Sequence, residues 1–113
     1  MQQISVDAVA ARVREWAAQG LKPVLLDVRE PWEVATARIT LNDASSVTIP
    51  MQQIPARLAE IDPQQPILAL CHHGMRSQQV GLFLDRQGYP EVYNITGGID
   101  AWSRQVDPGV PVY

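Results

Sequence analysis

Short apolar runs alternate with segments of helical periodicity along this 113-residue chain, and this alternation constrains the fold more than any other feature. Each run is too short to be a helix, and the segments between them repeat apolar residues at the spacing of one helix face. Strands separated by helices pair in parallel, so the pattern predicts an α/β domain with a mostly parallel sheet. The expected strands are residues 24–28, 47–49, 67–70 and 92–95.

The helical segments carry recognisable start and stop residues. Ser5 is a good N-cap for the first helix, Ile4 and Val9 occupy the positions of a hydrophobic staple, and Gly20 ends the helix. Three of the later segments open at a proline or a glycine pair. The expected helices cover residues 6–19, 31–37, 55–61, 76–87 and 98–102.

Aromatic residues are expected to pack rather than to bind a ligand. Trp16, Trp32 and Trp102 fit helix faces, so we predict that all three are core or half-buried groups. Residues 107–113 contain prolines and a glycine and cannot form a regular helix. This tail is expected to lie along the surface, held there by Tyr113.

Size and charge exclude several classes of function. A chain of this length with 46% hydrophobic residues is long enough for one domain, residues 1–113, around one core. Nine basic and twelve acidic residues give a net charge of −3, and the basic residues are scattered. We therefore expect neither nucleic acid nor a membrane surface as a partner. No apolar run approaches the ~20 residues of a membrane span.

The chain contains one cysteine, Cys71, and the N-terminal residues lack the basic-then-apolar pattern of a secretory signal. A lone cysteine excludes an internal disulfide and a multi-cysteine zinc site. It fits a reducing compartment, so a cytoplasmic location is expected. No cofactor is implied. The lone thiol is either a small core residue or a nucleophile, and its neighbours favour the second.

Cys71 follows the most apolar expected strand and begins a loop that leads into a helix. Ligands of parallel α/β domains bind beyond the carboxyl ends of strands, where loop N–H groups and a helix N-terminus favour an anion. These groups and Arg76 favour the thiolate, which is the reactive form. Gly74 can adopt backbone angles that let the loop curl around the sulfur. The loop residues are His72, His73, Gly74, Met75, Arg76 and Ser77.

Each loop side chain also has a structural interpretation. His72 and His73 can be polar loop residues, and one of them can tune the thiolate. We predict no metal site, because adjacent loop residues seldom converge on one ion and no carboxylate or second thiol is near in sequence. Arg76 can bind an anionic substrate or pair with a carboxylate. Met75 is either a harmless exposed side chain or an apolar lip that shields the sulfur or meets a partner.

Two further charged residues are expected near the same rim. Asp27 and Arg29 come at the carboxyl end of another expected strand. Their favoured role is structural, in a network of salt bridges and hydrogen bonds that holds the loops and can include Arg76. Direct contact with substrate is the minority alternative.

Three segments of the chain, taken together, resemble the single-domain rhodaneses, a family of sulfurtransferases. Residues 71–77 resemble the active-site loop, with four residues between cysteine and arginine where cysteine phosphatases have five. Residues 26–33, Leu-Asp-Val-Arg-Glu-Pro-Trp-Glu, resemble a motif after an early strand. Residues 96–102, Thr-Gly-Gly-Ile-Asp-Ala-Trp, resemble the start of the last helix. The three occur in the family's order over nearly the whole chain.

The resemblance implies a rhodanese-like domain with a parallel sheet of about five strands flanked by helices. It implies that Cys71 takes a sulfane sulfur from a donor such as thiosulfate and passes it, as a persulfide, to a thiol, a protein or another thiophilic acceptor. Because there is no second cysteine, the acceptor must come from outside the chain. The alternatives are a non-catalytic binding or sulfur-sensing module and, less favoured by the short loop, phosphatase or arsenate reductase chemistry.

One segment departs from the family pattern. Rhodaneses commonly carry His-Ile-x-Gly-Ala before the next strand, whereas this chain has Arg38, Ile39, Thr40 and Leu41, followed by Asn-Asp-Ala. The departure concerns the local turn and a partner surface rather than the nucleophile.

Overall fold

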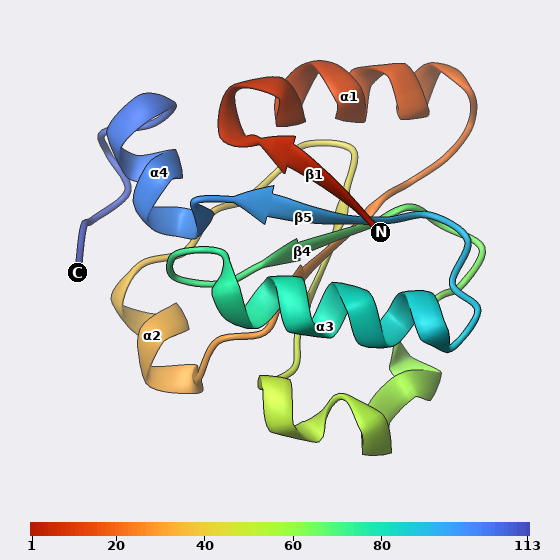
Figure 1. The fold of residues 1–113 in the computed structure, drawn as a ribbon. Coiled ribbons are helices and arrows are strands. Elements are labelled where there is room, and N and C mark those ends of the chain that lie inside the picture. Colours follow the sequence, from red (N-terminus) through yellow and green to blue (C-terminus); the bar gives the residue numbers. More distant parts are fainter.

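Five parallel strands form one sheet in the computed structural model, which describes residues 1–113. The strand order is β1-β5-β4-β2-β3 (Figure 1). The predicted α/β fold with about five parallel strands is therefore confirmed. The strands are β1 (Gln2–Ser5), β2 (Val24–Asp27), β3 (Ser45–Thr48), β4 (Ile67–Leu70) and β5 (Val92–Thr96).

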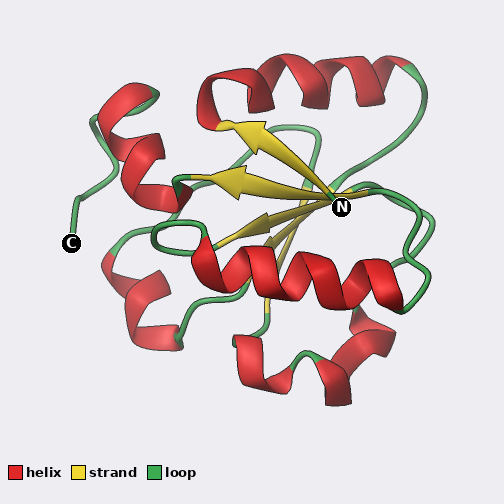
Figure 2. Cartoon of the chain, in the orientation of Figure 1, coloured by secondary structure: helices red, strands yellow, loops and turns green.

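Helices cover both faces of this sheet (Figure 2). None of them has both the length and the apolar character that crossing a membrane requires. They are α1 (Val6–Ala18), α2 (Pro31–Thr36), α3 (Met75–Arg86) and α4 (Gly98–Gln105), with short 3₁₀ helices η1 (Met51–Gln53) and η2 (Pro55–Glu60).

The central strand β4 and its neighbour β2 are buried along their whole length, which explains their mostly apolar sequences. Their alternate side chains enter two cores. One core lies under α1 and α4 and includes Leu68, Trp16 and Trp102. The other lies under α3 and the 3₁₀ helices and includes Ile67 and Leu84. The two-sided burial fixes the register of β4, and it therefore also fixes the position of Cys71, the residue that follows the carboxyl end of this strand.

The sequence analysis missed β1, the edge strand that pairs with β5. It has one buried apolar side chain, Ile4, among three exposed polar residues, so it lacks the apolar run of a central strand. Backbone pairing with β5 supplies what the sequence pattern does not show. Ser5 precedes α1 as predicted, but its side chain makes no capping hydrogen bond. Ser5 is also the last residue of β1, where it pairs with Thr96.

Two other expectations concern surface features. Trp16 and Trp102 are buried as predicted, but the prediction for Trp32 is wrong, because its side chain is 64% exposed at the start of α2. Its ring meets the Tyr113 ring edge-on, with 6.2 Å between centroids. In the segment that departs from the family pattern, Asp43 makes the turn with a φ of 63°, a left-handed conformation that glycine adopts more readily.

Candidate active site

Cys71 lies directly beyond the carboxyl end of β4, and only 1% of its surface is exposed. The loop curls back so that the backbone N–H of Gly74 donates a hydrogen bond to Cys71 Sγ over 3.0 Å. Gly74 has a φ of 101°, which is unfavourable for any residue with a side chain, and this angle closes the loop before α3 begins at Met75. Residues 71–76 thus form a cup around the buried sulfur, next to the N-terminus of α3.

The start of α4 holds the other side of this loop. The backbone N–H of Ile99 donates to the carbonyl oxygen of Cys71 over 2.9 Å, and that of Asp100 donates to His72 over 3.0 Å. Gly98 makes this approach feasible, since a Cβ there would collide with the carbonyl oxygens of both loop residues. The glycine pair of the last motif therefore supports the cysteine loop, although it is distant in sequence.

Behind the sulfur lies a buried polar pair that joins α3 to β5. The hydroxyl of Ser77 is 3.3 Å from Cys71 Sγ and also donates to Asn94 Oδ1. Ser77 was among the predicted loop residues, whereas sequence reasoning missed Asn94. The signal was present: Asn94 is a polar residue inside the apolar β5, where a buried amide must find partners.

Arg76 does not point into the cup. It forms a two-bond ion pair with Glu33 of α2, with Nη1–Oε1 and Nη2–Oε2 distances of 2.7 and 2.9 Å. These hydrogen bonds hold the pKa of the Glu33 carboxyl at about 2, well below its ordinary value. Of the two roles weighed for Arg76, the structure contains the pairing with a carboxylate. The side chain is still 32% exposed at the rim, so its outer edge can meet an anion.

Asp27 and Arg29 form the second ion pair near the rim. Arg29 is fully buried and donates to both carboxylate oxygens of Asp27, over 2.9 and 2.7 Å. It also donates to the hydroxyl of Tyr113 over 2.9 Å, and this hydroxyl donates to Glu33 over 2.8 Å. The chain of contacts runs on to Arg76, so the network expected from the sequence is present and includes this residue.

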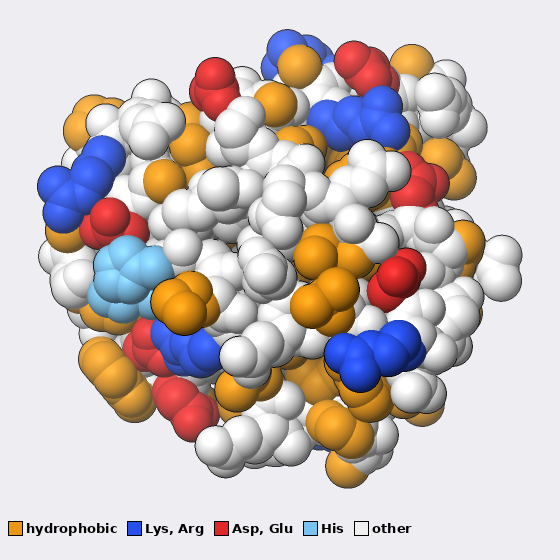
Figure 3. All heavy atoms as spheres, viewed as in Figure 1, with side chains coloured by type: hydrophobic (Ala, Val, Ile, Leu, Met, Phe, Trp, Pro, Cys, Tyr) orange, Lys and Arg blue, Asp and Glu red, His pale blue; other side chains and the backbone are white.

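Tyr113 also holds the tail against the loop, as expected. Its ring stacks on the His72 ring with 3.9 Å between centroids and 3° between planes. His72 in turn stacks on His73, again at 3.9 Å. The Met75 side chain, in contrast, is 77% exposed. On the face drawn in Figure 3 the two histidines lie among acidic, basic and hydrophobic side chains, without a continuous basic area.

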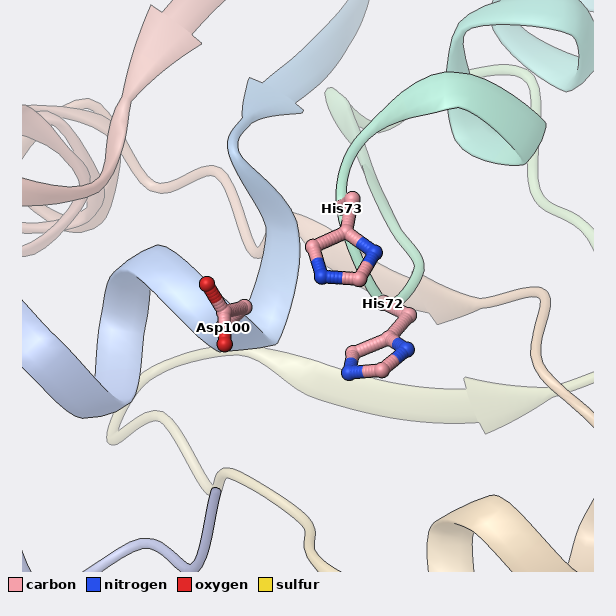
Figure 4. Close-up of side chains that lie close together, drawn as sticks. All are labelled: His72, His73 and Asp100. Carbon is pink, nitrogen blue, oxygen red and sulfur yellow. The ribbon is translucent and has the colours of Figure 1, made fainter. Parts of the chain in front are cut away.

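The fold brings a carboxylate to the two histidines, which sequence spacing did not suggest. One ligand atom each from His72, His73 and Asp100 lie within 4.8 Å of one another (Figure 4). Two of these groups already have partners: His72 Nε2 is 2.7 Å from the Tyr113 carbonyl oxygen, and Asp100 pairs with Arg104 at 3.1 Å. The two rings are stacked face to face, so they do not direct lone pairs at a common point. Stacking and ion pairing account for the cluster, and we assign no metal to it.

These features define a class of protein. A buried cysteine at the carboxyl edge of a parallel sheet, touched by a backbone N–H and facing a helix N-terminus, is suited to nucleophilic attack and to holding a small anionic group. The domain is an α/β fold with a buried cysteine in the loop at the carboxyl edge of its parallel sheet.

The comparison with protein families names this class. The model of the rhodanese-like domain matches residues 7–105, and the chain belongs to this family. A protein of Allochromatium vinosum named Sulfurtransferase is 37% identical over 89 residues, covering 79% of this chain and 77% of that protein. A chloroplast protein of Arabidopsis thaliana, Rhodanese-like/PpiC domain-containing protein 12, is 40% identical over 93 residues; the match covers 79% of this chain and only 30% of that longer protein.

Solved structures agree with the fold. The crystal structure of a rhodanese-like domain protein from Staphylococcus aureus is similar with a TM-score of 0.74 and 26% sequence identity. The similarity covers 100% of this chain and 99% of that one.

Proposed function

We propose that the protein is a sulfurtransferase that moves a sulfane sulfur from a donor such as thiosulfate to a thiophilic acceptor through a persulfide on Cys71. The observation that carries the proposal is the 3.0 Å hydrogen bond from the Gly74 N–H to Cys71 Sγ, in a loop of four residues between Cys71 and Arg76. A relative of 37% identity that bears the name Sulfurtransferase supports it.

The first half-reaction loads the cysteine. The thiol proton is lost to water, and the Cys71 thiolate attacks the outer sulfur of thiosulfate. A bond forms between Sγ and that sulfur, the sulfur–sulfur bond of the donor breaks, and sulfite leaves with the bonding electron pair. The Gly74 N–H and the N-terminus of α3 are placed to stabilise the negative charge of the persulfide.

The second half-reaction empties the cysteine. A nucleophile such as cyanide or a thiolate attacks the outer sulfur, the bond to Sγ breaks, and the Cys71 thiolate is restored. No other cysteine exists in the chain to form an internal disulfide. The acceptor is therefore a separate molecule, either a small thiol or a protein that reaches the cup.

Arg76 and its network position the rim in this scheme. Glu33 fixes two guanidinium nitrogens, and the exposed edge of Arg76 remains available to an anionic donor. Tyr113 and Arg29 hold Glu33 in turn. Asp27 supports Arg29 and acts through it rather than by touching the donor.

The test is the intact mass of the protein after incubation with thiosulfate, with Cys71→Ser as the matched control. We expect a gain of one sulfur atom in the natural protein, reversed by cyanide, and none in the variant. If thiosulfate, polysulfide and a persulfide of a small thiol all fail to load reduced protein, the sulfurtransferase proposal is wrong. The binding-module interpretation would then explain the cup.

A further inference from the structure

The guanidinium of Arg76, at the rim of the cup, is already occupied by a carboxylate. Its two terminal nitrogens, Nη1 and Nη2, donate to the two carboxylate oxygens of Glu33 over 2.7 and 2.9 Å. These two nitrogens form the fork with which an arginine binds two oxygens of an anion at once. Glu33 therefore takes the contacts that Arg76 would otherwise offer most strongly to an anionic sulfur donor.

Glu33 is held firmly in this position. Its Oε1 also accepts the backbone N–H of Glu30 over 3.0 Å, and its Oε2 also accepts the Tyr113 hydroxyl over 2.8 Å. The carboxylate is buried, so it cannot turn away from Arg76 without losing bonds that water does not replace. The hydrogen bonds from Arg76 hold the pKa of Glu33 at about 2, so its negative charge is present at neutral pH.

The ion pair lies within electrostatic reach of the sulfur. The hydrogen bonds to Glu33 are the largest cause that raises the pKa of Arg76; burial opposes them, and the negative charge of ionised Cys71 adds to them. The other arginine of the rim network, Arg29, is fully buried and is neutralised by Asp27. A donor that reaches Cys71 thus meets two arginines whose charges are each balanced by a carboxylate.

Sulfane donors differ in the charge that they bring to this rim. Cys71 Sγ bonds to the outer sulfur of thiosulfate, and the departing sulfite carries two negative charges. With methanethiosulfonate, Sγ bonds to the same outer sulfur, the sulfur–sulfur bond breaks, and methanesulfinate leaves with the electron pair and one negative charge. The two donors have similar sizes, since a methyl group replaces one charged oxygen. A fixed carboxylate opposes the first donor more than the second.

We propose that Glu33 is a specificity-determining residue of the loading step: it neutralises Arg76 and occupies its fork, and so disfavours doubly charged donors such as thiosulfate relative to singly charged ones. The inference rests on the proposed function for the reaction, but the binding that it predicts does not require turnover. Glu33 acts on the donor through its charge and through Arg76.

Glu33→Gln is the informative substitution. The Glu30 N–H needs an acceptor, so the glutamine oxygen stays at the Oε1 position and its NH₂ group faces Arg76 Nη2, which loses its acceptor. Binding is measured in the Cys71→Ser background, where no sulfur can be transferred, by following the Gly74 N–H in NMR titrations at about pH 8, above the usual titration range of histidine. Thiosulfate and methanethiosulfonate are the two probes.

Glu33→Gln should bind methanethiosulfonate about threefold more tightly and thiosulfate about tenfold more tightly, because the gain in free energy scales with the charge of the anion. In sulfur loading, with Cys71 present, the ratio of kcat/KM for thiosulfate to that for methanethiosulfonate should rise about threefold. Glu60→Gln is the matched control. It removes the same charge from an exposed pair with Arg57, so it should change neither affinity.

Two further measurements separate this role from a structural one. Adding Arg76→Gln to Glu33→Gln should abolish the gain in thiosulfate affinity, because the freed guanidinium is its source. Raising the salt concentration from about 0.02 to about 0.2 M should also reduce that gain, whereas with Glu33 present thiosulfate affinity should change by less than about twofold.

The proposal is overturned if Glu33→Gln gains no thiosulfate affinity, gains equally for both anions, or keeps its gain without Arg76. If Glu33→Gln does not fold, the protein with Glu33 decides alone: thiosulfate binding that weakens steeply with salt would show an unneutralised cation and overturn the inference. A gain in binding without sulfur loading from any donor would refute the proposed function and leave this inference intact. Loading without the gain would do the reverse.

Discussion

Replacing Glu33 by glutamine tests whether the ion pair at the rim stabilises the fold. Glu33 is buried in α2 and accepts two hydrogen bonds from Arg76 and one from Tyr113. Glutamine keeps the size and one acceptor oxygen but removes the charge. The substitution therefore isolates the ionic part of the interaction, which joins α2 to the N-terminus of α3 across 43 residues of sequence.

The size of the effect follows from the Glu33 pKa. The Arg76 hydrogen bonds lower this pKa from 4.5 to about 2, which corresponds to about 3 kcal/mol of free energy. Since Arg76 is 32% exposed, solvent screening reduces the expected loss in Glu33→Gln to about 2 kcal/mol. Because the folded pKa is the lower one, the contribution is fully present above about pH 5 and is lost as the pH falls towards 2.

The assay is urea unfolding of both proteins at a series of pH values. The natural protein should exceed Glu33→Gln by about 2 kcal/mol at about pH 7, and this difference should shrink steadily below about pH 5. Glu60→Gln is the matched control: Glu60 pairs with Arg57 in the same manner but on the exposed surface, so its loss should change little. A difference that is absent at about pH 7, or that persists unchanged in acid, would refute the reasoning.

Three other substitutions test features of the same region. Gly98→Ala should lower the free energy of unfolding by more than about 3 kcal/mol and displace the cysteine loop, because the added Cβ would collide with two loop carbonyl oxygens at a strained, positive φ. Gly20 also has a positive φ but lies in open space, so Gly20→Ala should lower this free energy by only about 1 kcal/mol in urea unfolding. Tyr113→Phe should lower the free energy of unfolding by about 1–2 kcal/mol, because the Tyr113 hydroxyl joins the buried Arg29 guanidinium to the Glu33 carboxylate. An unchanged Tm in thermal unfolding would contradict this prediction. Trp32→Ser should change stability by less than about 0.5 kcal/mol by the same assay, because the side chain is mostly exposed; a larger loss would mean that its contact with the Tyr113 ring stabilises the tail.

The parts of the fold predicted correctly depend on local patterns. The strand β4, the loop after it and α3 follow from an apolar run, a glycine and a helix-period segment that are contiguous in sequence. The edge strand β1 could not be found in this way, since its single buried residue, Ile4, makes no pattern. Trp32 was misplaced because periodicity cannot tell the buried side of a six-residue helix from its exposed side.

The sequence alone determined the strands β2 to β5, the position of Cys71 at a strand end and the length of its loop, because neighbouring residues settle these features. The tertiary structure decided which side chains surround that loop. Glu33 reaches Arg76, Tyr113 reaches Arg29, and Asn94 reaches Ser77 across 43, 84 and 17 positions of sequence. Such contacts depend on how strands β2, β4 and β5 bring their carboxyl ends together, and this geometry exists only once the sheet has formed.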